Sequence, residues 1–87
     1  MKVKDLIEEL KEIDGDAEII MSSDAEGNEY TKLDRVVAPV YYVPAYQWSG
    51  DLYFYNKLTD ELRSDGYDEE DMAPDDSINS VVFIPIN

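Results

Sequence analysis

The sequence predicts a small α+β domain: a mostly antiparallel sheet of three to four strands covered by an N-terminal helix, with short helices in an acid-rich segment. An amphipathic stripe opens the chain, and runs of β-branched and aromatic residues follow between turn residues. Hydrophobic residues make up 44% of the chain, which is close to the globular norm. No linker or repeat divides the sequence, so residues 1–87 are expected to form a single acidic domain.

The first predicted element is a helix over residues 3–13. Apolar residues recur at helical spacing on one face, and charged residues occupy the other. The apolar face consists of Val3, Leu6, Ile7, Leu10 and Ile13. Gly15 lies between two aspartates and is expected to end the helix as a left-handed cap.

Four segments are expected to be extended. Residues 17–22 are rich in β-branched residues and end at a turn in which Gly27 and Asn28 tolerate positive φ. Residues 33–43 contain strong β formers, but Pro39 cannot donate to a ladder. That stretch is therefore either an edge strand or two short strands that meet at a bulge or bend. Residues 52–55 form a short strand, and residues 80–86, apolar on both faces, favour a central strand.

Two short helices are expected before the last strand. Thr59 is a good N-cap, and the acidic residues that follow it suit the positive end of a helix. Asp65 and Gly66 close this helix, and residues 67–72 are expected to form a second short turn of helix before Pro74.

The composition excludes much of ordinary enzyme chemistry. The chain has 21 acidic and 7 basic residues, a formal net charge of −14, no histidine and no cysteine. Zinc sites built on Cys or His, thiol nucleophiles, Ser–His–Asp triads and disulfides are therefore absent. We expect no catalytic residues, no cofactor and a non-enzymatic function. The charge also argues against direct binding to nucleic acid or to an anionic membrane, because both would repel an acidic surface.

The loop at residues 24–29 superficially resembles a calcium loop. It places oxygen-bearing side chains at positions 1, 3, 5 and 6, but an EF-hand requires Gly at position 6 and Glu at position 12. Here Gly27 falls at position 4 and Arg35 at position 12. No specific metal site is therefore expected. The carboxylate cluster Asp68-Glu69-Glu70-Asp71 could bind calcium or magnesium loosely, so a loosely calcium-responsive acidic module is a third functional alternative.

The start of the chain has no apolar signal region, because acidic residues interrupt it, and no apolar run approaches the roughly 18 residues that a membrane-spanning helix needs. A soluble protein of the cytoplasm is expected.

The densest feature is the segment 60–76, which we call the acidic segment. It contains nine acidic residues and one base, Arg63, so it contributes −8 of the net charge of −14. Self-repulsion of this kind lowers stability, which favours a surface that meets a basic partner, although a simply solvated acidic face is the alternative. The candidate partner-binding acids are Asp60, Glu61, Asp65, Asp68, Glu69, Glu70, Asp71, Asp75 and Asp76.

Seven of the ten aromatic residues lie within residues 41–55. Tyr46 and Trp48 fall in a loop that contains Pro, Ser and Gly, so exposure and a role as interface anchors are expected for them, with a place in the core as the alternative. Tyr53 and Phe54 are expected to complete the core.

Short motifs at both ends of the chain resemble those of small acidic phage-encoded proteins. They are the opening Val3-Lys4-Asp5-Leu6-Ile7-Glu8-Glu9-Leu10, then Asp16-Ala17-Glu18-Ile19-Ile20 and Ser22-Ser23-Asp24-Ala25-Glu26-Gly27-Asn28, and later Leu58-Thr59-Asp60-Glu61-Leu62, Gly66-Tyr67 and Val81-Val82-Phe83-Ile84-Pro85. The resemblance implies a phage or prophage setting, expression inside a bacterium and a host-directed role. Small acidic phage proteins include inhibitors of restriction and of CRISPR effectors, and some act as DNA mimics. The resemblance transfers no functional residue to this chain.

Together these features predict a non-catalytic protein that occludes a basic, nucleic-acid-binding surface of a host or phage protein, steered by the acidic segment and anchored by Tyr46 and Trp48. The alternative is a structural or assembly accessory of a phage particle or replication complex that binds through a strand edge at residues 40–43.

Overall fold

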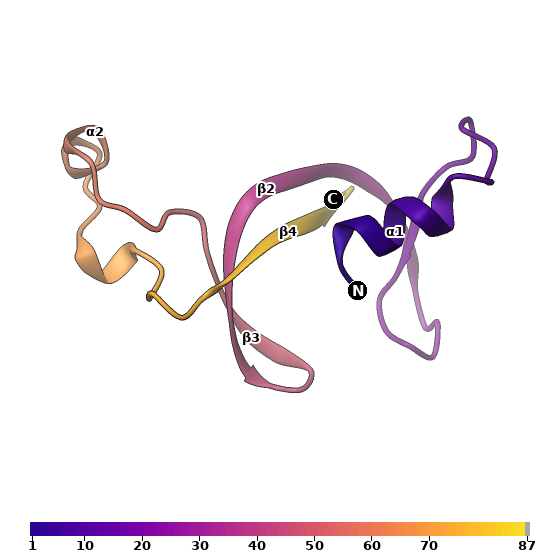
Figure 1. Ribbon diagram of the computed structural model, residues 1–87. Coiled ribbons are helices and arrows are strands. Elements are labelled where there is room, and N and C mark those ends of the chain that lie inside the picture. Colours follow the sequence, from indigo (N-terminus) through magenta and orange to yellow (C-terminus); the bar gives the residue numbers. More distant parts are fainter. Residues whose placement is uncertain (87) are drawn as a thin grey trace. The chain divides into compact units, whose positions relative to one another are not determined.

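The computed structural model describes residues 1–86 and confirms the predicted fold class, an antiparallel four-stranded sheet with an N-terminal helix and short helices (Figure 1). The chain divides into two compact units. Unit 1 comprises Met1–Arg35 and the residues from Phe83 onward, and unit 2 comprises Val36–Val82. The predicted single domain extends to Asn87, which lies outside the described residues, and it stays a prediction. No helix within residues 1–86 is long and apolar enough to cross a membrane.

Helix α1 (Val3–Leu10) begins as predicted but ends three residues earlier than residue 13. The carboxylate of Asp5 accepts a hydrogen bond from the Lys2 amide at 3.0 Å, which satisfies one of the free donors at the N-terminus. Lys11 is the C-cap in a right-handed helical conformation. The predicted left-handed cap at Gly15 is wrong, because positive φ within residues 1–86 occurs at Gly27 and Gly66 only.

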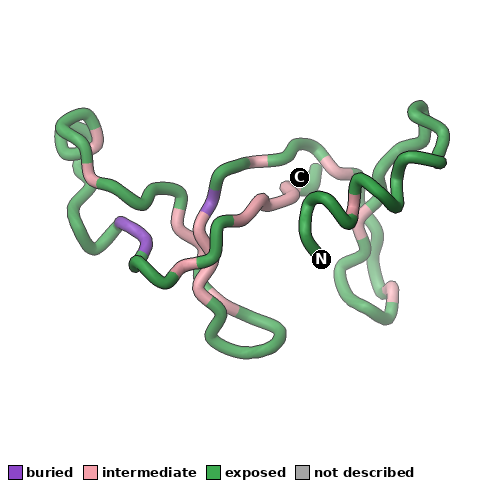
Figure 2. The backbone as a smooth tube through the Cα atoms, in the orientation of Figure 1, coloured by how far each residue is buried: buried purple, intermediate pink, exposed green. Residues whose placement is uncertain are grey.

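The apolar stripe of α1 exists but is largely exposed. Leu6 is half-buried, while Val3, Ile7 and Leu10 count among the exposed apolar residues (Figure 2). A helix that covered a sheet tightly would bury this stripe, since burial of such a face supplies most of a helix's stability in proteins. The periodicity therefore predicts the helix correctly, but the helix buries less of its apolar face than a helix packed tightly against a sheet would.

In unit 1, the short strand β1 (Ile20–Ser22) pairs antiparallel with the start of β2 (Tyr30–Tyr46), with Ile20 opposite Lys32 and Ser22 opposite Tyr30. The predicted strand at 17–22 is therefore shorter than expected. In the connecting turn Gly27 has φ of +73°, as predicted, whereas Asn28 does not use the positive region.

Strand β2 is one continuous 17-residue strand rather than an edge strand or two short strands, and it pairs with all three other strands. Pro39, whose bond to Ala38 is cis, lies between the residues that pair with β1 and those that pair with β3. The N–H that proline lacks is therefore not needed by either of these two ladders.

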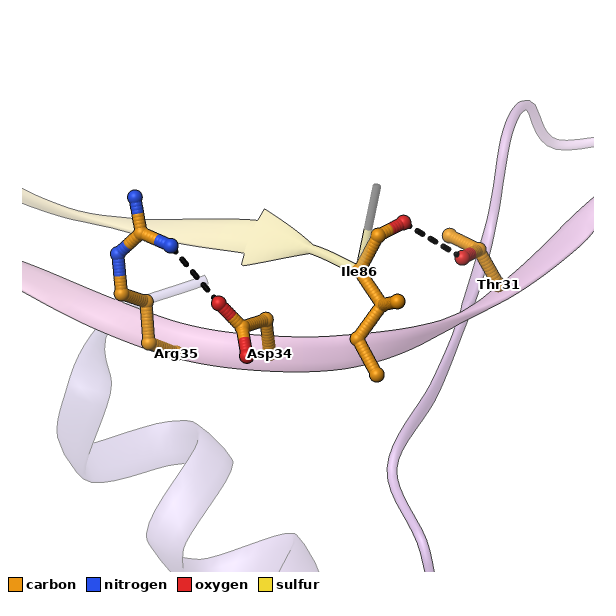
Figure 3. Close-up of polar contacts among 4 residues, drawn as sticks. All are labelled: Thr31, Asp34, Arg35 and Ile86. Carbon is orange, nitrogen blue, oxygen red and sulfur yellow. Dashed lines mark hydrogen bonds and ion pairs between the residues drawn. The ribbon is translucent and has the colours of Figure 1, made fainter.

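Strand β4 (Ile78–Pro85) pairs with β2 alone among the described residues, so the predicted central position is wrong. Apolar residues on both faces of a strand indicate that the faces are covered, not that both edges are paired. Residues 80–84 are indeed half-buried on both faces. Just past β4, Ile86 donates its amide to the Lys32 carbonyl at 2.8 Å and accepts from the Thr31 hydroxyl at 3.3 Å (Figure 3).

In unit 2, β2 turns back into β3 (Ser49–Tyr53), and α2 (Asp60–Ser64) and the 3-10 helix η1 (Glu69–Asp71) follow on the connection to β4 (Figure 1). Both short helices fall in the predicted segments. The buried residues are few: Val40 at 0% exposure, with Met72 and Ala73 directly after η1 (Figure 2). The amide of Ala73 donates to the Tyr55 carbonyl at 2.8 Å, so the end of η1 is tied to the chain that leaves β3.

Helix α2 ends in a Schellman motif. The Gly66 amide donates to the Arg63 carbonyl and the Tyr67 amide to the Leu62 carbonyl, both at 3.1 Å, and Gly66 has φ of +99°. Gly66→Ala is expected to cost about 1–2 kcal/mol of unfolding free energy, because a Cβ is disfavoured at positive φ.

Gly15→Ala is the matched control, since neither glycine has a heavy atom within 4 Å of the added Cβ and only Gly66 has positive φ. Urea unfolding of both variants measures the difference. Equal losses in the two variants would contradict the conformational explanation.

Candidate acidic and aromatic binding surface

The acidic segment contains two short helices, α2 and η1, and side-chain hydrogen bonds cap the N-terminus of each. The Thr59 hydroxyl accepts from the Leu62 amide at 3.2 Å and caps α2 as predicted. In η1, Asp68 accepts from the Glu70 amide and Asp71 accepts from the Asp68 amide, each at 2.9 Å. These caps form because short acidic side chains reach back to free amides at helix starts. The local sequence thus places seven of the nine carboxylates on two capped turns or at their caps, while Asp75 and Asp76 follow them.

All nine predicted acids of this segment are exposed. Within residues 1–86 only Asp68 and Asp71 among them use their carboxylates in hydrogen bonds. The two ion pairs found among the described residues, Lys11–Glu8 and Arg35–Asp34, belong to unit 1 (Figure 3 shows the second). The acidic segment therefore keeps its negative charge without an ion-pair partner in the described chain.

The two predicted anchor rings are exposed. The rings of Tyr46 and Trp48 stack with centroids 5.7 Å apart and planes 13° apart, and the residues are 65% and 82% exposed. Tyr46 is the last residue of β2, beside a bulge at residues 44–46, and Trp48 lies in the turn before β3. Stacking holds each ring in one orientation, which lowers the entropy lost when a partner covers them.

The prediction that Phe54 completes the core is wrong, since it is 53% exposed, while Tyr53 is half-buried. The reason is that β3 ends at Tyr53. Phe54 lies beyond the ladder, where alternation no longer directs side chains inward.

Phe54 instead lines two neighbouring hollows in unit 2 together with Tyr55. The first, of about 540 Å³, also meets Tyr41, Lys57 and Glu61. The second, of about 360 Å³, contains no basic residue, and we call it the tyrosine groove. It is lined by Leu52, Tyr53, Phe54, Tyr55, Tyr67, Glu70 and Asp71.

The tyrosine groove is built around a pair of rings. Tyr55 and Tyr67 meet edge to face, with centroids 5.2 Å apart and planes at 69°. The neighbouring Tyr55 raises the pKa of Tyr67 above its ordinary 10.0, with smaller contributions from desolvation, a hydrogen bond to Tyr55 and the charges of Asp65 and Asp71. The charges of Asp65 and Asp71 are the smallest of these causes of the raised pKa.

The structure thus groups some predicted site residues and separates others. Glu70 and Asp71 share the tyrosine groove, whereas Tyr46 and Trp48 line neither hollow and belong to the β2–β3 turn (Figure 1). Sequence reasoning did not select Tyr55 and Tyr67. The available signal was the placement of Tyr67 inside the acidic segment, directly after Gly66.

In the calcium-like loop at residues 24–29, the first carboxylate, that of Asp24, accepts hydrogen bonds from other residues of the loop. Asp24 Oδ1 accepts from the amides of Glu26 and Asn28 at 2.9 and 3.3 Å, and Oδ2 accepts from the Asn28 side chain at 2.6 Å. Across residues 1–86, no group of three acidic side chains is placed to hold a metal ion.

These hydrogen bonds, led by the one from the Asn28 side chain, lower the pKa of Asp24 below its ordinary 3.8. A lowered folded-state pKa contributes stability above the unfolded pKa, and this contribution is lost as the pH falls through the folded value. Asn28→Ala is expected to raise the pKa of Asp24 back towards 3.8, as measured by carboxyl-carbon NMR titration. An unchanged midpoint would contradict the assigned cause.

Comparisons with protein-family models, with curated proteins and with solved structures find no match to this chain.

Proposed function

We propose that this chain is a non-catalytic, phage-type binding protein that occludes a basic, nucleic-acid-binding surface of a host protein, as an anti-restriction, anti-CRISPR or DNA-mimic inhibitor does. One observation carries the proposal. The acidic segment holds nine exposed carboxylates, seven of them on the capped turns α2 and η1 or at their caps, and no ion pair within residues 1–86 neutralises them.

An array of this kind has a physical cost that a partner relieves. Like charges repel at close spacing, so the folded state loses stability unless a cation compensates them. Duplex DNA presents about one negative charge per 1.7 Å of its axis, and carboxylates held on a fold imitate part of that field. A protein that binds phosphates through Lys and Arg therefore offers the complementary surface.

The exposed stack of Tyr46 and Trp48 supplies the packed anchor that charge alone does not provide. Electrostatic complementarity mainly speeds association and selects partners, whereas slow dissociation depends on well-packed anchors. Tyr and Trp are enriched among the residues that dominate binding energy at interfaces. Unit 2 carries both features, the acidic segment and the ring stack.

The proposed setting is the cytoplasm of a bacterium that carries the phage. This setting rests on the motif resemblance. The non-catalytic role rests on a composition without His or Cys, which leaves few groups for catalysis. The alternative role, assembly through a free strand edge at residues 40–43, gains no support. Val40 is buried, and Tyr41, Tyr42 and Val43 pair with β3.

The testing experiment is capture of proteins from bacterial lysate on the immobilised full chain. We expect the retained proteins to be DNA-binding proteins and to be released both by added duplex DNA and by raising salt from about 50 to 200 mM, because the contacts are ionic. Retained proteins that neither DNA nor salt releases would contradict the proposal.

A further inference from the structure

We infer that the tyrosine groove receives an arginine side chain from the basic partner, so that Phe54, Tyr55 and Tyr67 read arginine in preference to lysine. The inference rests on the proposed function and adds the chemistry that the partner must present.

The rings are available to a ligand. Phe54 is 53% exposed, and Tyr55 and Tyr67 are each more than a third exposed, although all three are large apolar side chains. An edge-to-face contact covers one face of one ring only, and both Tyr55 and Tyr67 line the hollow. Exposed aromatic faces in a concave site favour a ligand that stacks on them.

The charged residues that line the tyrosine groove are both acidic. They are Glu70 and Asp71. The basic residue Lys57 lines the neighbouring hollow but not the tyrosine groove. One oxygen of Asp71 accepts from the Asp68 amide, while within residues 1–86 the Glu70 carboxylate makes no hydrogen bond or ion pair. Charge complementarity therefore selects a cationic occupant.

The combination of rings and carboxylates selects arginine among the cations. A guanidinium is planar, stacks on aromatic faces and donates two parallel hydrogen bonds to a carboxylate, whereas an ammonium is a strongly hydrated point charge. A hollow of about 360 Å³ suits one side chain rather than a helix or a strand.

The frame holds the groove in place. The Ala73 amide binds the Tyr55 carbonyl at 2.8 Å, and Met72 and Ala73 beside it are buried. The Schellman bond from Tyr67 to Leu62 fixes the other ring's backbone. A preordered site loses less entropy on binding.

The test uses two labelled peptides of Gly and Ser with equal numbers of basic residues, all arginine in one and all lysine in the other. Fluorescence anisotropy with the full chain at about 0.15 M salt is expected to give roughly fivefold tighter binding of the arginine peptide, from stacking beyond charge. Tyr67→Leu and Phe54→Ala are expected to reduce this ratio to near one while the lysine peptide binds as before. Tyr67→Phe, which keeps the ring, should retain the preference.

Tyr30→Leu is the control, because Tyr30 is an exposed tyrosine of unit 1. Equal affinity of the unmodified chain for both peptides, or a preference that survives Tyr67→Leu and Phe54→Ala, would overturn the inference. If either variant fails to fold by circular dichroism, Glu70→Gln replaces it, and loss of the arginine preference is again required. The lysate capture is scored separately, so arginine selectivity can fail while occlusion of DNA-binding proteins stands.

Discussion

Replacing Glu69, Glu70 and Asp75 with lysine is expected to weaken binding of the captured DNA-binding proteins by about 10- to 100-fold at physiological salt. Each replacement changes the charge by +2, so three change the acidic segment from −8 to −2 and the chain from −14 to −8. These three carboxylates make no hydrogen bond within residues 1–86, whereas Asp68 and Asp71 cap η1 and are left intact. The amount of each protein recovered from lysate measures the effect.

Lysine at Glu9, Glu12 and Glu18 provides the control. These acids lie in unit 1, make no ion pair among the described residues, and their replacement also changes the net charge from −14 to −8. If recovery falls equally in both triple variants, total charge rather than the acidic segment governs binding, and the proposed site is wrong.

Val40→Asp is expected to unfold unit 2. Val40 is the fully buried side chain of the described residues, and an unpaired carboxylate there has no cation to compensate it. We expect a loss of more than about 4 kcal/mol, the range in which single substitutions abolish a small domain's fold. Loss of near-ultraviolet circular dichroism and of the denaturant transition measures it.

Val36→Asp tests the same chemistry at a different burial. Val36 lies in the same strand and is 53% exposed, so its carboxylate stays in water and should cost within about 0.5–1 kcal/mol. Similar losses in the two variants would mean that Val40 is not the centre of the core.

The features that the sequence predicted correctly depend on neighbours along the chain. Thr59 caps α2, and Gly66 ends it at positive φ, because each of these roles is set within one turn of helix. The helix near the N-terminus follows from its 3.6-residue period, and Gly27 takes positive φ in the predicted turn.

Apart from the cap at Gly15 and the end of α1, the features that were predicted wrongly depend on contacts between distant segments. Pro39 lies in a central strand, between the residues that pair with β1 and those that pair with β3. Strand β4 lies at an edge although both faces are half-buried, and Phe54 leaves the core because β3 ends one residue before it. None of these facts has a local sequence signal.

The same distinction separates the parts of the candidate site. Composition and order along the chain determine by themselves the acidic segment, its capped helical turns and the ring-bearing turn at Tyr46 and Trp48, because charge density and caps are local properties. Only the tertiary structure brings Tyr55 against Tyr67 at 5.2 Å and places Glu70 and Asp71 beside them. The contact between Tyr55 and Tyr67 joins the chain after β3 to the loop after α2. A hydrogen bond from the Ala73 amide to the Tyr55 carbonyl stabilises it. The contact therefore forms only once the intervening chain has folded back.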